Sequence, residues 1–333
     1  MEKIDFVVTW VDGNDPGWLA ERAQYLPVKQ DTGNSIIRFR DWDLMKYWFR
    51  GVEKFAPWVN NVYFVTWGHI PEWLNTKHPK LRIVDHAEYI PQQYLPTFNS
   101  NVIELNLHRI PELSEKFVLF NDDTLLTDHV TEKDFYKKGL PCDTVILGQG
   151  FAMSPDDIFS YTTFNNVAII NKYFDKKKVI KTHWKKLFSL KTGNQLIRNV
   201  LLLPFGHFSG FLDCHLPASH LKSNFIEIWD REGKVLDECC LHRFRSKCDV
   251  THWLMKNWCA CKGTYMPRNI NWGKSYSIGD DVNMLSAIES QKYKVVCLND
   301  CNEELDFEKW KRLIAESFEK LLPDVSSFEI DAE

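Results

Sequence analysis

Short apolar segments recur along the first third of this chain, and each ends at a polar turn. They are rich in β-branched and aromatic side chains, which predicts β-strands. The segments are residues 4–10, 61–67, 81–85 and 117–120. Residues 41–55 repeat apolar side chains at helical spacing, and Pro57 closes that segment, so we expect a helix there. Strands that alternate with helices predict an α/β fold whose sheet is mostly parallel.

Acidic side chains follow three of these segments. They are Asp12, Asp85 and the neighbouring pair Asp122 and Asp123. In open α/β sheets, ligands bind in the crevice beyond the carboxyl ends of the strands. The pattern therefore predicts a functional site at that edge of the sheet.

The rest of the chain predicts further elements with less regular spacing. We expect a helix at 101–107, strands at 225–229 and 294–298, and an amphipathic helix at 305–322. We expect one domain at 1–325, with an α/β half at 1–150, a helical insertion at 151–210 and a part at 211–325 that completes the site. The acidic residues 326–333 predict a frayed tail.

Composition excludes several classes of protein. Hydrophobic residues make up 44% of the 333 residues and the formal net charge is -4, which is typical of a globular chain and excludes disorder. A general nucleic-acid binder would need a strongly basic face, so we expect no nucleic-acid partner. The 13 tryptophans indicate either a bulky core or a surface that stacks on sugars or bases.

Cysteines and the N-terminal residues bear on the cellular compartment. Eight of the nine cysteines follow residue 200, and no C-x2-C pair is present, which favours free thiols over a zinc site. The zinc alternative would use Cys239, Cys240, His242, Cys248, Cys259 and Cys261. The first residues do not have the pattern of a signal peptide, and no apolar run is long enough to span a bilayer. We therefore expect a cytoplasmic protein.

Two acidic clusters are candidate cation sites. Adjacent carboxylates at Asp122 and Asp123 repel each other unless a cation or hydrogen-bond donors neutralise them, and Mg²⁺ prefers such oxygen ligands. Asn299 and Asp300 repeat the same Asn-Asp pattern after a later apolar segment. Asp12 sits on a glycine turn and could bind a cation or a ribose. The alternatives are a solvated strand end for the pair and a simple Asx turn for Asp12.

Other polar groups could bind a sugar or a phosphate. Asn99, His108 and Arg109 could orient either one, or could only cap and solvate a helix. His215, with Lys222 nearby, is a candidate general base, although a lone histidine is more often structural. Arg243 and Arg245 flank Phe244, and from a strand they would point the same way, as bidentate phosphate binding needs. The alternative is a ladder of surface ion pairs.

Motifs for established phosphate and acyl-transfer sites are missing from the sequence. It contains no P-loop, no GxGxxG fingerprint and no GxSxG elbow. Any phosphate must therefore be held by arginine, lysine, a metal or helix ends.

Taken together, these segments resemble four sequence blocks of the Stealth proteins, which are sugar-1-phosphate transferases of microbial polysaccharide synthesis. The family is related to the lysosomal-enzyme N-acetylglucosamine-1-phosphotransferase of animals. The first block matches residues 4–16. The second, which is the most specific, runs through Arg38-Phe39-Arg40-Asp41, Ala56-Pro57-Trp58-Val59, Ile70-Pro71-Glu72-Trp73-Leu74, Leu95-Pro96-Thr97-Phe98-Asn99-Ser100, His108-Arg109-Ile110-Pro111 and Phe120-Asn121-Asp122-Asp123.

The third and fourth blocks are specific only in combination. The third comprises Asn165-Asn166, His215-Leu216-Pro217 and Arg243-Phe244-Arg245-Ser246, and the fourth is Cys297-Leu298-Asn299-Asp300. Leu216 departs from the family, which more often has alanine there. The resemblance covers most of residues 4–300.

The resemblance implies a fold and a reaction. The fold is a Rossmann-like nucleotide-sugar-binding α/β sheet with helices on both faces and an inserted, more irregular helical region. A UDP-hexose or UDP-N-acetylhexosamine donates sugar-1-phosphate to a hydroxyl of a polysaccharide or oligosaccharide acceptor, and UMP leaves. The product is a phosphodiester of a capsule, exopolysaccharide or wall glycan.

Roles for the residues follow from that reaction. Asp122, Asp123, Asn299 and Asp300 would hold Mg²⁺ or Mn²⁺. His215, or alternatively Asp123, would be the base, and Arg243 and Arg245 would hold phosphate oxygens. The groups that bind or position nucleotide or sugar would be Asp12, Asn99, His108, Arg109 and Lys222.

Alternatives to this function remain open at this point. A metal-dependent glycosyltransferase would use the same carboxylates but release UDP, and a glycan-binding module would ignore both Mg²⁺ and UDP-sugar. The acceptor could be lipid-linked. The lysines between 176 and 186 or the terminal helix could then touch the inner face of an anionic membrane, and a solvated basic face is the simpler alternative.

Overall fold

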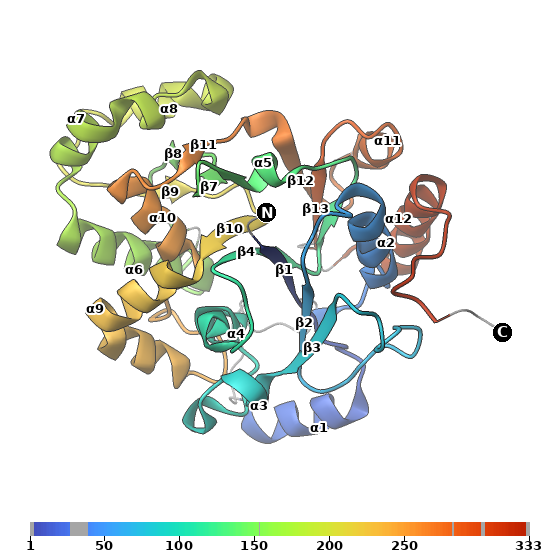
Figure 1. Cartoon of the computed structure of the whole chain (residues 1–333). Helices are drawn as coiled ribbons and strands as arrows, with labels where there is room; N and C mark the ends of the chain where they lie inside the picture. Colours follow the sequence, from blue (N-terminus) through green and yellow to red (C-terminus); the bar gives the residue numbers. More distant parts are fainter. Residues whose placement is uncertain (1–2, 27–38, 153, 282, 301–303, 331–333) are drawn as a thin grey trace.

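The computed structural model describes residues 3–26, 39–152, 154–281, 283–300 and 304–330 (Figure 1). Its central sheet has five strands. β1 (Ile4–Thr9) lies between β4 (Lys116–Asn121) and β2 (Val62–Thr66), with β3 (Leu81–Asp85) and β10 (Ala218–Leu221) at the two edges. Strands β1 to β4 are parallel, and β10 is antiparallel to β4. The predicted α/β fold with a mostly parallel sheet is confirmed.

Helices cover both faces of this sheet, which explains why every residue of β1 before Thr9 is buried and why most of them are apolar. Phe6 and Val8 pack into a core with α2 (Met45–Phe55) and α12 (Phe307–Leu321). Val7 points to the other face, into a second core with α4 (Ser100–Leu105), α9 (Lys222–Cys240) and α10 (Trp253–Lys262). Figure 1 shows the two groups of helices on opposite sides of the sheet.

A second sheet of three strands continues from the end of β4. β13 (Val295–Asn299) runs parallel to β12 (Gly273–Ser277) and antiparallel to β5 (Thr124–Leu126). The Leu298 N–H donates a hydrogen bond of 2.9 Å to the Asp123 carbonyl. This pairing places the carboxyl end of β13 beside that of β4, although the two ends are far apart in the sequence.

The predicted helical insertion forms the outer edge at the upper left of Figure 1. It contains α6 (Ile158–Tyr173), α7 (Lys176–Leu187), the 3-10 helix η5 (Leu190–Gln195) and α8 (Leu196–Leu201). The remaining helices are α1 (Pro16–Tyr25), α3 (His86–Tyr89), η3 (Gln92–Tyr94), η4 (Leu107–Arg109), α5 (Glu132–Phe135), η6 (Ile270–Trp272) and α11 (Met284–Glu289). The short strands are β6 (Tyr136–Lys137), β7 (Leu140–Asp143), β8 (Ile146–Leu147), β9 (Phe211–Leu212) and β11 (Met266–Pro267).

Two expectations about elements fail. Residues 225–229 were expected to form a strand, but they lie inside α9, where Phe225, Ile228 and Leu236 recur at helical spacing and are buried. The predicted frayed tail fails for residues 326–330. Phe328 is buried there, and Arg50 forms an ion pair of 2.9 Å with Glu329. Residues 331–333 lie outside the described part of the chain.

Tryptophans and cysteines serve mainly in packing. Trp18, Trp48 and Trp258 are among the largest fully buried side chains, so the bulky-core interpretation is confirmed. All eight cysteines within the described residues are free thiols. Among the described residues, only Asp123, His215 and Cys297 form a group with metal-ligating geometry. None of the residues named for the zinc alternative belongs to this group. No described helix is long and apolar enough to cross a bilayer.

Candidate active site

A pocket of about 220 Å³ lies at the carboxyl ends of β1, β4 and β13. Thr9 and Asn121 are register partners at the ends of β1 and β4, so both strands deliver their next residues to the same place. Leu298, Asn299 and Asp300 arrive from β13. The site expected beyond the strand ends is thus a real cavity, into which sequentially distant residues converge.

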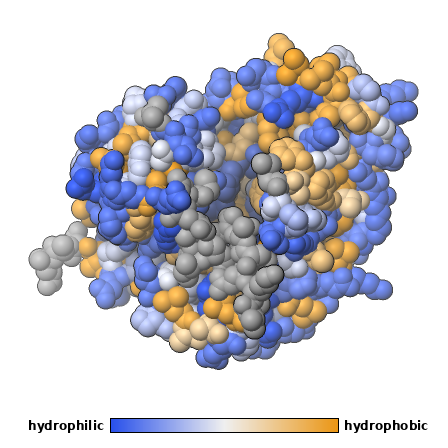
Figure 2. Space-filling view, turned by 180° about the vertical axis from the view of Figure 1, so that it is seen from behind, coloured by the Kyte–Doolittle hydropathy of each residue, from blue (hydrophilic) through white to orange (hydrophobic). Residues whose placement is uncertain are grey.

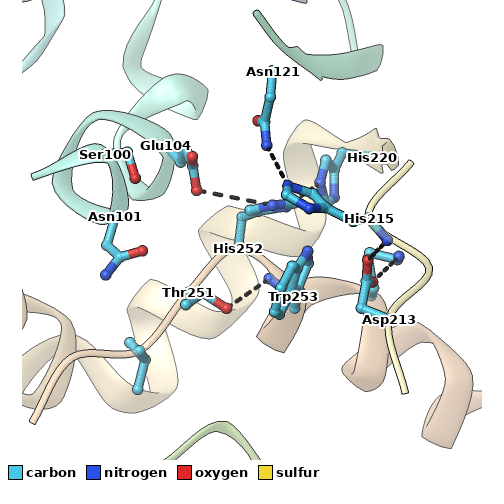
Figure 3. A network of polar contacts seen from close by, with 12 residues as sticks. Ser100, Asn101, Glu104, Asn121, Asp213, His215, His220, Thr251, His252 and Trp253 are labelled. Atoms are coloured by element: carbon cyan, nitrogen blue, oxygen red, sulfur yellow. Dashed lines mark hydrogen bonds and ion pairs between the residues drawn. The ribbon is translucent and has the colours of Figure 1, made fainter. Parts of the chain in front are cut away.

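His215 reaches this pocket because of the direction of β10. Since β10 runs antiparallel to β4, the residues just before β10 lie beyond the carboxyl end of β4. Nε2 of His215 lies 3.2 Å from Nδ2 of Asn121 and 3.9 Å from Oδ2 of Asp123. The backbone at His215 has a φ of 49°, in the left-handed region that non-glycine residues rarely adopt. The histidine is therefore held at an energetic cost, and Figure 3 shows its ring turned toward Asn121 at the end of β4.

A buried ion pair holds the backbone of this segment. The His215 N–H donates a hydrogen bond of 2.7 Å to Oδ1 of Asp213, and Lys256 forms an ion pair with the same carboxylate. Burial by itself would raise the pKa of Asp213, but Lys256 outweighs it and keeps the pKa below its ordinary value. Asp213 therefore stays ionised and fixes the position of His215 (Figure 3).

Acidic side chains dominate the polar lining of the pocket. The lining contains five acidic side chains against two arginines: Asp41, Glu104, Asp122, Asp123, Asp300, Arg40 and Arg245. Desolvation by the surrounding walls, together with the nearby carboxylates of Asp123 and Asp41, raises the pKa of Asp122 to about 7, even though solvent reaches this side chain through the pocket. Such mutual repulsion is relieved when a cation binds between the carboxylates.

One group of residues in the pocket has the geometry to hold a metal ion. Ligand atoms of Asp123, His215 and Cys297 lie within 4.8 Å of one another. Oδ1 of Asp123 is buried and has no hydrogen-bond partner within the described residues. Burial raises the pKa of the Cys297 thiol well above its ordinary value, and its sulfur donates to Oδ2 of Asp123 at 3.4 Å. A protonated thiol is a poor ligand, so oxygen atoms are the better donors here.

Arginines face these carboxylates across the pocket. Nη2 of Arg245 donates a hydrogen bond of 2.8 Å to the Ser100 hydroxyl, and Nη1 of Arg40 lies 3.8 Å from Oδ2 of Asp300. The two guanidinium groups give the pocket two donors for phosphate oxygens.

Glu104 joins the pocket to a buried chain of polar groups. Burial raises its pKa to about 7, although Arg245 opposes the shift. Nε2 of His252 lies 3.8 Å from the Glu104 carboxylate, and Nδ1 of His252 lies 3.1 Å from Nε2 of His220. Burial lowers the pKa of His252 to about 3, so between pH 3 and 7 His252 is neutral and Glu104 keeps its proton (Figure 3).

Only one of the two predicted arginines lines the pocket. Residues 242–245 form no strand, so Arg243 and Arg245 do not point the same way, which corrects the expectation made from their alternation. Arg243 is exposed and stacks over the Tyr25 ring, with its Cζ 4.8 Å from the centroid.

Five predicted substrate-binding residues are also absent from the pocket lining within the described chain. The Asn99 amide is buried and donates to Asp249 at 2.8 Å, while the Asp12 carboxylate accepts from the Asn14 N–H at 2.8 Å, as in an Asx turn. On the far side of the sheet, the Arg109 guanidinium lies over Trp229, with its Cζ 4.6 Å from the ring centroid.

The other two face the second core. The His108 ring lies against Phe225, with centroids 5.9 Å apart, and burial lowers its pKa to about 4. Nζ of Lys222 donates to the Ile110 carbonyl at 2.8 Å. All five have clear structural partners, and their predicted contacts with substrate stay predictions.

Sequence reasoning gave no role to several polar residues of the pocket, among them Arg40, Asp41 and Glu104. Arg40 and Asp41 are in the block that resembles the Stealth proteins, but the block alone assigns them no role. Ser100 and Glu104 are one helical turn apart on α4, and that spacing was the available signal that both face one way. Arg38, from the same block, lies outside the described residues.

Comparison with known proteins gives matches over the whole chain. The models of Stealth protein conserved regions 1 and 2 match residues 2–27 and 38–142. A capsular polysaccharide phosphotransferase of Streptococcus pneumoniae is 45% identical, with 99% of this chain and 98% of that protein covered. An exopolysaccharide phosphotransferase of Lactiplantibacillus plantarum is 40% identical, with 98% and 96% covered. A receptor polysaccharide phosphotransferase of Streptococcus oralis is 41% identical, with 99% and 100% covered.

Among solved structures, a galactosyltransferase in complex with donor and acceptor sugar analogues aligns with 97% of this chain and 98% of that chain. Its sequence identity is 10% and its TM-score is 0.37, which is too low to inform either fold or function.

Proposed function

This chain belongs to the Stealth family of polysaccharide phosphotransferases, and from that premise we propose that it transfers a hexose-1-phosphate or N-acetylhexosamine-1-phosphate from a UDP-sugar to a glycan hydroxyl. Transfer of sugar phosphate in polysaccharide synthesis is the activity that its family relationship supports. The observation that supports the location of the site is the pocket in which a histidine, two arginines and five acidic groups meet.

The chemistry is an exchange of one phosphorus–oxygen bond for another. The acceptor oxygen bonds to the phosphorus that bears the sugar, the phosphoanhydride bond to the uridylyl phosphate breaks, and UMP leaves with that electron pair. The proton of the acceptor hydroxyl must pass to a base. The product is a phosphodiester between two sugars.

His215 is the base in this proposal. In its neutral form the His215 ring can accept the proton, and the Asp213 anchor fixes the residue while Asn121 orients the ring. Asp123, 3.9 Å away, stabilises the imidazolium that results. Asp123 as the base is the alternative, and it would leave His215 to position the hydroxyl.

The carboxylates are suited to a divalent cation with oxygen ligands. The buried Oδ1 of Asp123, which has no hydrogen-bond partner among the described residues, and the elevated pKa of Asp122 both fit Mg²⁺ or Mn²⁺ held by Asp122, Asp123, Asn299 and Asp300. When bound, such an ion neutralises charge on the diphosphate. Without it, five acidic groups would repel a donor that is itself an anion.

Arg245 and Arg40 hold phosphate oxygens in this proposal, because both line the pocket. Arg243, Asp12, Asn99, His108, Arg109 and Lys222 are better explained by their packing and hydrogen-bonding partners, so we propose that they support the site without touching the donor. Eight free thiols among the described cysteines favour a reducing compartment, such as the cytoplasm.

The identity of the released nucleotide tests the reaction. The protein is incubated with a panel of UDP-sugars, Mg²⁺ and a glycan acceptor, and the nucleotide is identified by chromatography. We expect UMP. Release of UDP would instead support a metal-dependent glycosyltransferase, and glycan binding without any turnover would support a binding module.

Two histidine variants test whether His215 is the base. His215→Ala is expected to lower UMP release by about 10²- to 10⁴-fold, because the proton of the hydroxyl loses its acceptor. His207→Ala, at an exposed histidine of the helical insertion, is the matched control and should keep wild-type release. If His215→Ala stays folded and close to wild-type turnover, His215 is not the base.

A further inference from the structure

In helix α8 the usual burial of side chains is reversed, because a polar residue is buried and apolar residues are exposed. Asn199 is its only buried residue. The Asn199 amide donates to the Leu187 carbonyl at 2.6 Å, and its Oδ1 accepts from the Leu147 N–H at 2.6 Å. Ile197 and Leu201, which are one turn apart, are 63% and 66% exposed. The polar side chain thus holds the helix to the protein, and the apolar side chains point to the outside.

Neighbouring residues extend this apolar surface. We define the outer patch as Leu190, Ile197, Val200, Leu201, Leu203 and Phe205, all of which are exposed. Leu190 alone is 87% exposed. The segment after α8 is fixed in place, because Nζ of the buried Lys176 donates to the carbonyls of Leu202 and Phe205 at 2.5 and 2.8 Å. These hydrogen bonds hold part of the outer patch in a defined position. Exposed apolar surfaces of this kind mark sites of interaction.

Charge is segregated onto the same part of the chain. Residues 172–207 contain nine lysines and arginines and one acidic residue, Asp175, which gives a formal charge of +8. The whole chain carries -4, so the remainder carries -12. Lys177, Lys178, Lys181, Lys185 and Lys191 are exposed on α7 and η5, next to the outer patch along the chain. Figure 1 shows α7 and α8 together at the outer edge, away from the sheet.

We propose that the outer patch and the lysines of α7 dock this protein on the surface of an anionic lipid bilayer. Apolar side chains that enter the interface, flanked by cations that meet lipid headgroups, are the two features of a peripheral membrane anchor. A second copy of the chain is a poorer occupant, because symmetric packing would bring two segments together that each carry a formal charge of +8. In Figure 2, hydrophobic atoms gather at the upper right, over the region of α7 and α8, on a face that is hollowed near its centre.

Vesicle sedimentation with the full chain tests this proposal independently of catalysis. One set of vesicles is phosphatidylcholine alone, and the other contains about one third phosphatidylglycerol. We expect the protein to bind only the anionic vesicles and to dissociate as salt is raised. The double variant Ile197→Ser/Leu201→Ser and the triple variant Lys177→Glu/Lys181→Glu/Lys185→Glu should each weaken binding by roughly tenfold or more.

Matched variants elsewhere separate specific docking from general stickiness. Leu241→Ser/Val325→Ser removes two exposed apolar side chains, and Lys77→Glu/Lys234→Glu/Lys292→Glu makes the same change of charge outside the basic region. Both should bind as the wild type does. The proposal is overturned if the wild type ignores anionic vesicles, if the controls weaken binding as much as the α8 and α7 variants, or if the α8 variant only dissociates a dimer. UMP release from a water-soluble acceptor reports separately on the proposed function.

Discussion

The pocket gathers five acidic side chains into a recess between strand ends, whereas α8 buries an asparagine and turns its isoleucine, valine and leucine outward. Each region reverses the usual distribution of residues, in which charges are solvated and apolar groups are inside. Folding alone favours neither arrangement, because clustered carboxylates repel one another and exposed apolar groups gain no burial energy. The comparison teaches that both regions are shaped for something that binds, a small charged ligand in one and an extended surface in the other.

Among the tests of this comparison, removing one carboxylate should produce the largest effect. Asp123→Asn keeps the shape of the side chain but removes the charge that lies 3.9 Å from Nε2 of His215, so UMP release is expected to fall by about 10³-fold. Wild-type protein should also gain thermal stability when Mn²⁺ is added, and the variant should not. Asp280→Asn, at an exposed carboxylate, is the control. Turnover within about threefold of wild type would show that the acidic recess does not serve catalysis.

Two arginine variants test which residues belong to the pocket. Arg245→Ala removes a donor that lines the cavity and should lower UMP release by about 10²-fold. Arg243→Ala removes an arginine two residues away that packs on Tyr25, and it should leave turnover within about twofold. Equal losses in the two variants would mean that the pocket extends to Arg243 when substrate is bound.

Glu104 provides a test through stability and pH. Its folded-state pKa of about 7 lies above the ordinary value of 4.5, so the folded protein holds the proton more tightly than the unfolded chain. The stabilisation is complete below pH 4.5 and is lost as the pH rises through 7, at a cost of about 3 kcal/mol in the free energy of unfolding. Glu104→Gln should remove this loss of stability between pH 4.5 and pH 7, as measured by denaturant unfolding at several pH values. Glu112→Gln, at an exposed glutamate, should keep the wild-type dependence, and an unchanged profile in Glu104→Gln would contradict the assignment.

The smallest effect is expected on the stability of α8. Ile197→Ser/Leu201→Ser should change the free energy of unfolding by less than about 1 kcal/mol, because both side chains are already in water. Leu236→Ala, at a fully buried leucine of α9, should cost about 3 kcal/mol. If the serine variant is destabilised as strongly as the leucine variant, the outer patch is part of the folded core.

Local pattern was enough to locate the four parallel strands of the central sheet and the acidic groups at their ends, but it gave no sign of the antiparallel strand β10. The sequence also identified α2 and α12, because their apolar stripes are long enough to repeat several times. The strand predicted at residues 225–229 was wrong because five residues with β-branched and aromatic character also fit a strand. Only the wider spacing of Phe225, Ile228 and Leu236 indicates the helix α9. A short apolar run cannot separate the two structures by periodicity.

The residues of the site were harder to assign, because contacts between distant segments decide their orientation. Arg243 and Arg245 share one short segment, but the backbone there is irregular and only Arg245 turns to the pocket. His108 and Arg109 lie in a conspicuous polar motif, yet η4 turns them toward α9, on the other face of the sheet. Glu104 has no local signal beyond its spacing from Ser100, and its altered pKa arises only from burial after folding.

The order of the chain has a consequence for biosynthesis. The pocket needs the ends of β1 and β4, the segment before β10 and the end of β13, so Asp300 must leave the ribosome before the last wall can form. The N-terminal strands can pair early, but contacts across nearly the whole chain close only afterwards. A prematurely terminated translation product would therefore have the acidic strand ends without their final partner, so activity begins only when synthesis has passed β13.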